Sequence, residues 1–331
     1  MISNLLIPAV LFFVIGFFAQ VIRSDLKFPA DLAKALSIYL LLGIGLHGGM
    51  ELAKADFGSA VDAVVAALAL GFLMPLLAYA ILRWLGRIDA LNSSAIAAHY
   101  GSVSAGTFLT ALAFLEVQNV EHETYPIIML AIMESPAIII GLLLAKFSRG
   151  PQVQNDNDAG KNGHSVVGEL LRDAFTNGSV ILLLGAILVG VLATPASLKK
   201  VMPFYDGIFM GVLSLFLLEM GMEAAKRIGE FRKVGIFLVG FGIAMPLIGG
   251  TIGLLVGHSM LGFSVGGVTL VAVLAASASY IAVPPAMRLA IPEANPSFYL
   301  TLSLGVTFPF NVIFGIPLYY EMAQWLAGQA A

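Results

Sequence analysis

Gly49–Lys54 reads GMELAK, and Gly221–Lys226 reads GMEAAK. Each string leads into a hydrophobic segment with a second shared pattern, Gly71-x-x-Met74-Pro75-Leu76 in the first and Gly242-x-x-Met245-Pro246-Leu247 in the second. The spacing is 172 residues from Gly49 to Gly221 and 171 residues from Pro75 to Pro246, so the register holds across both patterns. The chain therefore contains a duplicated half. Such duplication is typical of membrane transporters whose substrate binds between the repeats.

The composition is that of a membrane protein. The 331 residues are 59% hydrophobic and 11% charged, whereas a soluble globular domain is roughly 25% charged. The mean hydropathy is +0.94, and apolar runs near the length of a membrane span recur along the chain. These runs are continuous instead of alternating, which favours helices over strands. There is no cysteine, which excludes disulfides, thiolate metal sites and cysteine nucleophiles.

The apolar runs predict ten transmembrane spans, at residues 4–22, 31–50, 60–85, 91–116, 125–147, 179–194, 203–224, 234–257, 265–291 and 296–326. The first lacks a basic leading region and a convincing cleavage site, so we expect a retained span and not a signal peptide. The long polar stretch Arg149–Gly178 is expected to be a flexible linker. We therefore expect an N-terminal five-helix repeat over residues 1–148, a linker over 149–178 and a C-terminal repeat over 179–331.

The basic residues predict the orientation of the two repeats. Because five is odd, two homologous halves must insert with opposite topology. Of the 17 lysines and arginines, all except Lys54, Lys199 and Lys200 fall in the loops and span ends of one side. The positive-inside rule places that side, with the linker, in the cytoplasm and both termini outside. The predicted fold is thus an all-α polytopic membrane protein made of two inverted five-helix repeats.

Polar and helix-breaking residues interrupt the fourth and ninth spans at equivalent places. The fourth carries Ser102 and Ser104 in a Gly/Ser-rich run, and the ninth carries Ser277 and Ser279 ahead of Pro284-Pro285. Unwound backbone at membrane depth is tolerated where it lines a cavity, and the half-helix ends suit small ions. The alternative is that small residues only allow close helix packing and that proline only kinks the helix. Packing alone is expected for Gly249-x-x-x-Gly253-x-x-x-Gly257 and for Gly45-x-x-x-Gly49.

Few ionisable residues lie within the spans. Glu134 in the fifth span requires a cation, a proton or a polar partner, so it is either a coupling-ion or proton site or a hydrogen-bonded structural residue. Its repeat counterpart Thr307, with Asn311, offers neutral oxygen ligands or plain interhelical hydrogen bonds. Tyr280 has a hydroxyl for substrate. We expect solvated or helix-ending carboxylates at Glu51, Glu219 and Glu223, and a satisfied interior histidine at His99.

Several function classes are excluded by missing motifs. No Walker A sequence is present, so direct drive by ATP is not expected. No HExxH or triad signature indicates an intramembrane enzyme, and there is no basic face for nucleic acid. We predict a transporter and not an enzyme, without a cofactor.

Three strings, together with a fourth stretch, resemble the cyanobacterial sodium-dependent bicarbonate transporters of the SbtA type over nearly the whole chain. The strings are GLHGGM at 45–50, GSVSAGT at 101–107 and MGMEAAKRIGEFRKV at 220–234, and the stretch runs from Ala272 to Ser297. The resemblance implies two inverted repeats, a core domain with crossing broken helices, a scaffold or gate domain, and a homotrimer. It implies sodium-coupled symport of bicarbonate by alternating access in a bacterial inner membrane, and a PII-like regulatory protein on the cytoplasmic face. It places the anion at Ser102, Ser104, Gly106, Thr107, Ser277 and Ser279.

The chain departs from that family pattern at four places. Tyr280 stands where an aspartate is expected, Val283 stands where glycine is expected before the two prolines, and Glu134 replaces an aspartate. The linker is also short, which bears on the PII-like partner. The absence of an aspartate at position 280 bears on the number of sodium ions transported and on the preferred anion.

Together these observations predict a sodium-driven symporter of bicarbonate in the lipid bilayer. We expect the anion to bind the six residues above and Tyr280, and sodium, the coupling ion, to bind Glu134, Thr107, Thr307 and Asn311. The alternatives are a symporter of another small organic anion, a sodium/proton exchanger that uses Glu134, and a passive channel or membrane sensor.

Overall fold

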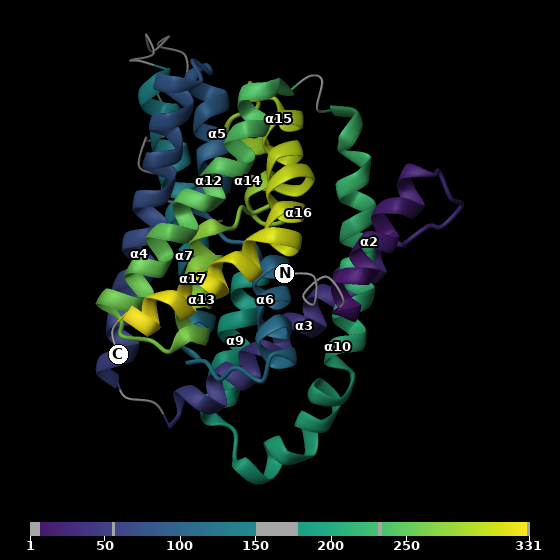
Figure 1. Ribbon diagram of the computed structural model, residues 1–331, viewed down its shortest axis with the longest axis vertical. Coiled ribbons are helices and arrows are strands. Elements are labelled where there is room, and N and C mark those ends of the chain that lie inside the picture. Colours follow the sequence, from purple (N-terminus) through teal and green to yellow (C-terminus); the bar gives the residue numbers. More distant parts are fainter. Residues whose placement is uncertain (1–6, 55–56, 150–177, 231–233, 330–331) are drawn as a thin grey trace, which may run out of the picture.

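The computed structural model describes residues 7–54, 57–149, 178–230 and 234–329, and within these ranges it contains helices and connections but no strand. Most of the predicted linker, residues 150–177, lies outside the described residues. The long helices run along the long axis of the molecule (Figure 1). The all-helical prediction is confirmed for the described part of the chain.

The first half consists of helices that follow the predicted spans closely. Their bounds are α2 (Pro8–Val21), α3 (Ala30–Leu52), α4 (Phe57–Ala80) with the π-helical η1 (Ile81–Leu85), α5 (Ala90–Gly101), α6 (Ala105–Val117) and α7 (Tyr125–Ser148). Local sequence sets several of these starts. Proline lies in the first turn of α2 and α7, where its missing N–H is harmless. Asp89 and Ser104 cap α5 and α6 with their side chains.

The second half contains more irregular helices. Its elements are α9 (Gly178–Leu192), α10 (Pro195–Lys226), η3 (Ile228–Glu230), α12 (Ile236–Leu255), η4 (Val256–Met260), α13 (Val265–Ala276), α14 (Val283–Ala290), α15 (Pro296–Leu300), η5 (Thr301–Thr307), α16 (Phe308–Phe310), η6 (Asn311–Gly315) and α17 (Ile316–Gln329). The helix that carries the predicted seventh span, residues 203–224, begins earlier, at Pro195. Thr194 caps α10 through the Ser197 amide, Pro195 occupies the first turn, and Pro203 lies inside the helix.

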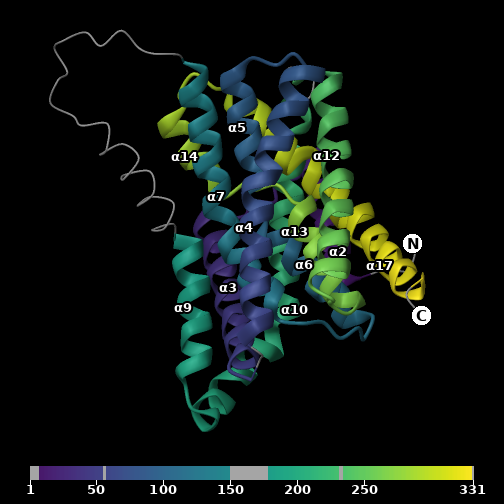
Figure 2. The ribbon, with the colours of Figure 1, turned by 90° about the vertical axis from the view of Figure 1, so that its left-hand side faces the viewer.

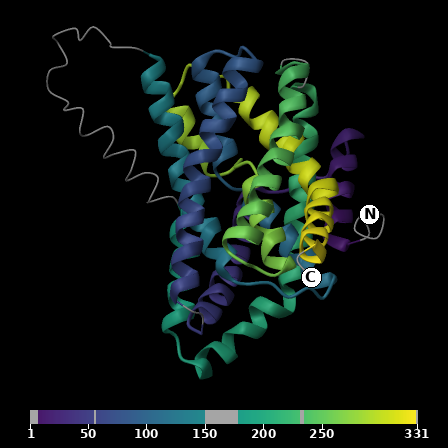
Figure 3. The same cartoon turned by 60° about the vertical axis from the view of Figure 1, so that its left-hand side comes forward.

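Within the described residues, seven helices are long and apolar enough to cross a membrane. Three shorter apolar helices, Pro8–Val21, Val180–Leu192 and Val265–Ala276, lie within the predicted first, sixth and ninth spans. The chain therefore has the features of a multi-pass membrane protein, and the count of ten spans stays a prediction. The connection between α9 and α10 lies at the opposite end of the molecule from the C-terminal end of α7 (Figures 2 and 3).

Two equivalent helix pairs pack through the repeated glycines. In the pair α2–α10, a Cβ at Gly221 would overlap the carbonyl of Phe13. In the pair α3–α9, a Cβ at Gly49 would overlap the carbonyl of Ile187 and meet the Cα of Gly190. Both GME strings therefore hold close backbone crossings near helix ends. Figure 1 shows α2 beside α10, and Figure 2 shows α3 beside α9.

The remaining helices form a second group around the interrupted spans. Here α4 and α7 pack on α5, and α12 packs on α13. The predicted packing face of α12 and η4 is confirmed, because Gly249, Gly253 and Gly257 lie against α13. The packing prediction for Gly45 is confirmed as well, since it lies against Leu183 and Ala186 of α9.

Candidate functional site

The two interrupted spans meet at their breaks. Residues 102–104 separate α5 from α6, and residues 277–282 separate α13 from α14. The amide of Ser104 donates to Ser277 Oγ at 3.0 Å, and the amide of Ser279 donates to the carbonyl oxygen of His99 at 2.8 Å. All four residues are almost fully buried. Each break is therefore hydrogen-bonded to the other half of the chain, and the predicted interruption of both helices is confirmed.

The N-terminus of α6 points free N–H groups at this meeting place. Ser104 Oγ accepts from the Thr107 amide at 3.2 Å and from Thr107 Oγ1 at 2.9 Å. The amides of Ala105 and Gly106 have no acceptor within the helix, because the first turn lacks preceding carbonyls. Together with the helix dipole, these donors favour a negative charge.

The start of α14 is a poorer anion site. The Val283 amide has Ser279 Oγ as a distant acceptor at 3.5 Å, and Pro284 and Pro285 have no N–H. The two prolines therefore form the first turn of α14. The sequence suggested that they interrupt a helix, but the break lies before them, at residues 277–282. Proline is tolerated there because no helical donor is lost. The positive end of α6 is the better provided with donors.

A small cavity lies where the crossing meets α3, α7 and α9. Its volume is about 30 Å³, which is enough for a small ion or for one or two waters. The polar side chains on its wall are those of Ser37, Ser104, Glu134, Ser279 and Tyr280. Apolar residues and backbone complete the wall, namely Leu41, Val103, Ala105, Leu130, Leu183, Ile281 and Ala282. The fold thus brings Glu134 to the same cavity as a serine of each break.

Glu134 faces this cavity without a cationic partner. The residue is 9% exposed, and no ion pair found among the described residues includes it. No lysine, arginine or histidine lines the cavity. Two like charges 4 Å apart repel each other by about 4 kcal/mol at an effective dielectric constant of 20. An ionised Glu134 therefore opposes an anion in the cavity unless a cation or a proton neutralises it.

Thr307 and Asn311 brace the same region but do not line the cavity. Thr307 Oγ1 donates to the carbonyl of Gly242 at 2.6 Å, so the hydroxyl of Tyr100 donates to Thr307 at 2.6 Å. Asn311 Nδ2 donates to the carbonyl of Ala276 at 2.9 Å, at the end of α13. Both predicted sodium ligands therefore make interhelical hydrogen bonds.

The predicted anion-binding serines differ in their surroundings. Ser277 Oγ donates to the carbonyl of Leu274 at 2.9 Å in addition to accepting from the Ser104 amide, so its only proton is already used. Ser102 Oγ is buried and has no hydrogen-bond partner among the described residues, but it does not line the cavity. Ser104 and Ser279 are the two predicted serines on the cavity wall.

The other ionisable residues of the sequence prediction have separate environments. Glu51 pairs with Lys54 at 2.8 Å, and Glu223 pairs with Lys226, so both end their helices as expected. Glu219 differs, because its Oε2 is buried without a hydrogen-bond partner in the described structure. His99 stacks on Tyr299 with ring centroids 4.4 Å apart and contacts the Ala95 carbonyl through Nδ1 at 2.7 Å. Its Nε2 is buried without a hydrogen-bond partner among the described residues, so the expectation of a fully satisfied histidine is wrong.

Ser37 is a cavity residue that sequence reasoning missed. It lies on α3, whose partner α9 contributes Leu183 to the same wall. A single serine in an apolar span has no distinguishing signal, and its place on the cavity depends on how α3 packs against the crossing.

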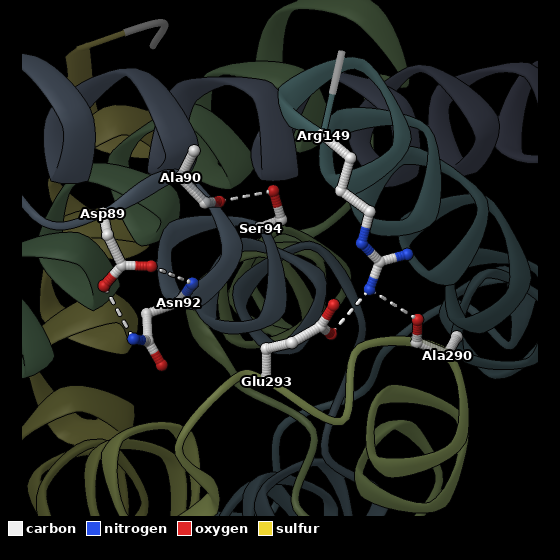
Figure 4. A network of polar contacts seen from close by, with 7 residues as sticks. All are labelled: Asp89, Ala90, Asn92, Ser94, Arg149, Ala290 and Glu293. Atoms are coloured by element: carbon white, nitrogen blue, oxygen red, sulfur yellow. Dashed lines mark hydrogen bonds and ion pairs between the residues drawn. The ribbon is translucent and has the colours of Figure 1, made fainter. Parts of the chain in front are cut away.

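A polar network joins the start of α5 and the end of α7 to the connection between α14 and α15 (Figure 4). Arg149 Nη2 donates to Glu293 Oε2 at 2.7 Å and to the Ala290 carbonyl at 3.1 Å. Asn92 Oδ1 accepts from the Asn295 amide at 2.7 Å, and Asn92 itself donates to Asp89. The pKa of Glu293 is lowered, first by a backbone hydrogen bond and then by Arg149. These contacts join α5 and α7 of one half to the α14–α15 connection of the other.

An equivalent contact is found at the start of α13. Ser264, which caps this helix, donates from its amide to Glu123 Oε1 at 2.8 Å and bonds Glu123 Oε2 through its hydroxyl at 3.0 Å. Glu123 precedes α7, just as Asn295 precedes α15. Each interrupted span is therefore fastened at its start to a connection of the opposite half.

The family model described as the Na⁺-dependent bicarbonate transporter superfamily matches residues 8–324 of the chain. Comparison with curated proteins finds no match.

Proposed function

Because the chain belongs to the Na⁺-dependent bicarbonate transporter superfamily, we propose that it is a symporter that imports bicarbonate together with sodium. The observation that supports this proposal best is the cavity of about 30 Å³ at the crossing. Its wall contains both the positive end of α6, which favours an anion, and the carboxyl group of Glu134, which favours a cation.

In this proposal the anion binds at the start of α6. The free amides of Ala105 and Gly106 and the hydroxyls of Ser104 and Ser279 face its oxygens. Ser277 and Thr107 hold Ser104 in place through the hydrogen bonds described above. Ser102 contributes its unpaired hydroxyl once the site opens. Hydrogen bonds to a charged acceptor stabilise such a complex by about 1.5–3 kcal/mol each.

Sodium couples to the anion through charge. Glu134 holds the ion on the cavity wall. The further ligands that the sequence indicated, Thr107, Thr307 and Asn311, lie off this wall and reach the ion only when the helices shift. A bound sodium cancels the repulsion between Glu134 and the anion, so each ion raises the affinity of the site for the other. No cofactor is required, because the ion gradient supplies the driving force.

Alternating access follows from relative motion of the two helix groups. The wall formed by Ser37, Leu41 and Leu183 belongs to the α3–α9 pair, and the rest belongs to the crossing and α7. Sliding of the crossing against α3 and α9 opens the cavity alternately to the two sides of the membrane. In the fold that we propose, ten spans form two inverted repeats, with both termini outside a bacterial inner membrane. A homotrimer and a PII-like partner on the cytoplasmic face complete the proposal.

The proposal is tested by uptake of radiolabelled bicarbonate into proteoliposomes. An inward sodium gradient should drive accumulation above equilibrium, and an equal potassium gradient should not. Absence of sodium-dependent accumulation contradicts the symport. If sodium alone acidifies or alkalinises the lumen without bicarbonate, the protein is instead a sodium/proton exchanger. Flux that does not saturate and ignores sodium indicates a channel, and binding without flux indicates a sensor.

A further inference from the structure

Tyr280 places a buried hydroxyl without a hydrogen-bond partner on the wall of the cavity. The residue is only 8% exposed, and its hydroxyl forms no hydrogen bond within the described structure. Glu219 and Ser104 are its polar neighbours, and Ser104 is close enough to interact with the hydroxyl. Ser104 Oγ already accepts from the Thr107 amide and hydroxyl, so it can only donate to Tyr280 and leaves the Tyr280 proton free. Leaving a polar group buried and unpaired costs about 1–3 kcal/mol, so such groups are uncommon without a reason. The hydroxyl therefore has a proton to donate to a ligand.

Gly106 makes room for this hydroxyl. A Cβ atom at Gly106 would overlap the oxygen of Tyr280, so any other residue type would displace the tyrosine. Gly106 lies in the first turn of α6, where its own amide has no helical acceptor. The phenol oxygen and the free amides of α6 therefore lie side by side.

Aromatic contacts hold the ring of Tyr280 in place. It packs on Phe308 in an edge geometry, with centroids 5.2 Å apart and an interplanar angle of 65°. Phe308 in turn packs on Phe13 of α2 at 5.6 Å and 72°. Because both neighbours are buried, the ring is a fixed part of the wall and not a mobile lid.

We propose that Tyr280 is the specificity-determining residue of the anion site. Its hydroxyl donates one hydrogen bond to an anion at the start of α6, and its ring limits the cavity to oxyanions with a single central atom. This inference rests on the proposed bicarbonate site and adds its selectivity.

The test measures anion affinity of purified protein in sodium, by competition with labelled bicarbonate. Tyr280→Phe keeps the ring and removes the donor, and should weaken bicarbonate binding about 10- to 100-fold. Tyr280→Ser removes the ring and should admit lactate, which the wild-type protein excludes. Tyr299→Phe is the matched control, because Tyr299 is buried but does not line the cavity, and it should bind bicarbonate as the wild type does.

Two results overturn the proposal. One is bicarbonate binding by Tyr280→Phe that equals the wild type, and the other is exclusion of lactate by a monodisperse Tyr280→Ser protein. Failure of the proposed function looks different, because the wild-type protein then binds no bicarbonate in sodium. If the wild-type protein binds bicarbonate in sodium but both Tyr280 variants keep its affinity and selectivity, only the proposed role of Tyr280 is contradicted.

Discussion

The amide of Ser104 donates a hydrogen bond of 3.0 Å to the hydroxyl of Ser277, across 173 positions of sequence. Each serine belongs to the break of a different half, so this bond fixes one break against the other. The Ser279 amide, bonded to the His99 carbonyl at 2.8 Å, is a second such tie. The amides of Ser104 and Ser279 lie in the breaks and have no helical acceptor. In each case the opposite interrupted span supplies the acceptor oxygen.

Replacing Ser277 by alanine should destabilise the protein without changing its charge. The Ser104 amide then loses its acceptor in a buried place, which costs about 1–3 kcal/mol. The midpoint of thermal unfolding in detergent should fall accordingly. Ser303→Ala is a suitable control, because Ser303 is equally buried but its hydroxyl only bonds the Tyr299 carbonyl within its own helical segment. An equal loss in both variants contradicts the special role of the Ser104–Ser277 bond.

Replacing Glu134 by glutamine should separate anion binding from sodium. The neutral amide no longer repels the anion, so bicarbonate should bind at least about tenfold more tightly than to the wild type in sodium-free buffer. Sodium should then improve binding little or not at all. Isothermal titration of bicarbonate with and without sodium gives both quantities.

The control for that experiment is Glu223→Gln. Glu223 is paired with Lys226 and does not line the cavity. The effect of sodium on the bicarbonate affinity of Glu223→Gln should therefore match that of the wild type. If Glu134→Gln keeps the full effect of sodium on bicarbonate affinity, Glu134 is not the coupling group.

The sequence was sufficient to predict the interruptions but not the cavity. Serines, glycines and prolines inside apolar runs mark the breaks at 102–104 and 277–282, because such residues weaken a helix wherever it packs. The place of Ser37 on the cavity wall and the contact of Tyr280 with Gly106 depend on which helices pack together. The hydrophobic periodicity of the sequence does not indicate which helices are neighbours. The start of α10 was readable, since Thr194-Pro195 is an N-cap followed by a first-turn proline. The predicted span nevertheless begins at residue 203, eight residues after the start of α10.

Alanine at Gly49 or Gly221 should disrupt the two close helix crossings. The added methyl group overlaps a backbone carbonyl of the partner helix in each case, and backbone cannot move aside as a flexible side chain can. Overpacking of this kind typically costs about 1–3 kcal/mol. We expect a clear drop in the thermal midpoint for both variants.

Gly185→Ala and Gly211→Ala are the matched controls for those crossings. They lie on α9 and α10, and a Cβ at either position meets no other atom within 4 Å. Because alanine is the better helix former, these two should be neutral or slightly stabilising, by up to about 1 kcal/mol. Destabilisation by all four substitutions alike argues against the close crossings as its cause.

The cap of α5 should make stability depend on acid. Burial opposes ionisation of Asp89, but hydrogen bonds from the Asn92 side chain and backbone outweigh it and lower its pKa below the ordinary 3.8. The folded protein therefore binds this proton more weakly than the unfolded chain. The resulting stability is fully present above pH 3.8 and is lost as the pH falls from there through the folded pKa. Asp89→Asn should retain the cap but lack this charge, and be less stable at pH 7 by up to about 1 kcal/mol. Thermal unfolding of both proteins from pH 7 to pH 3 should show the gap narrowing at the acid end, and a constant gap contradicts the role of the Asp89 carboxylate.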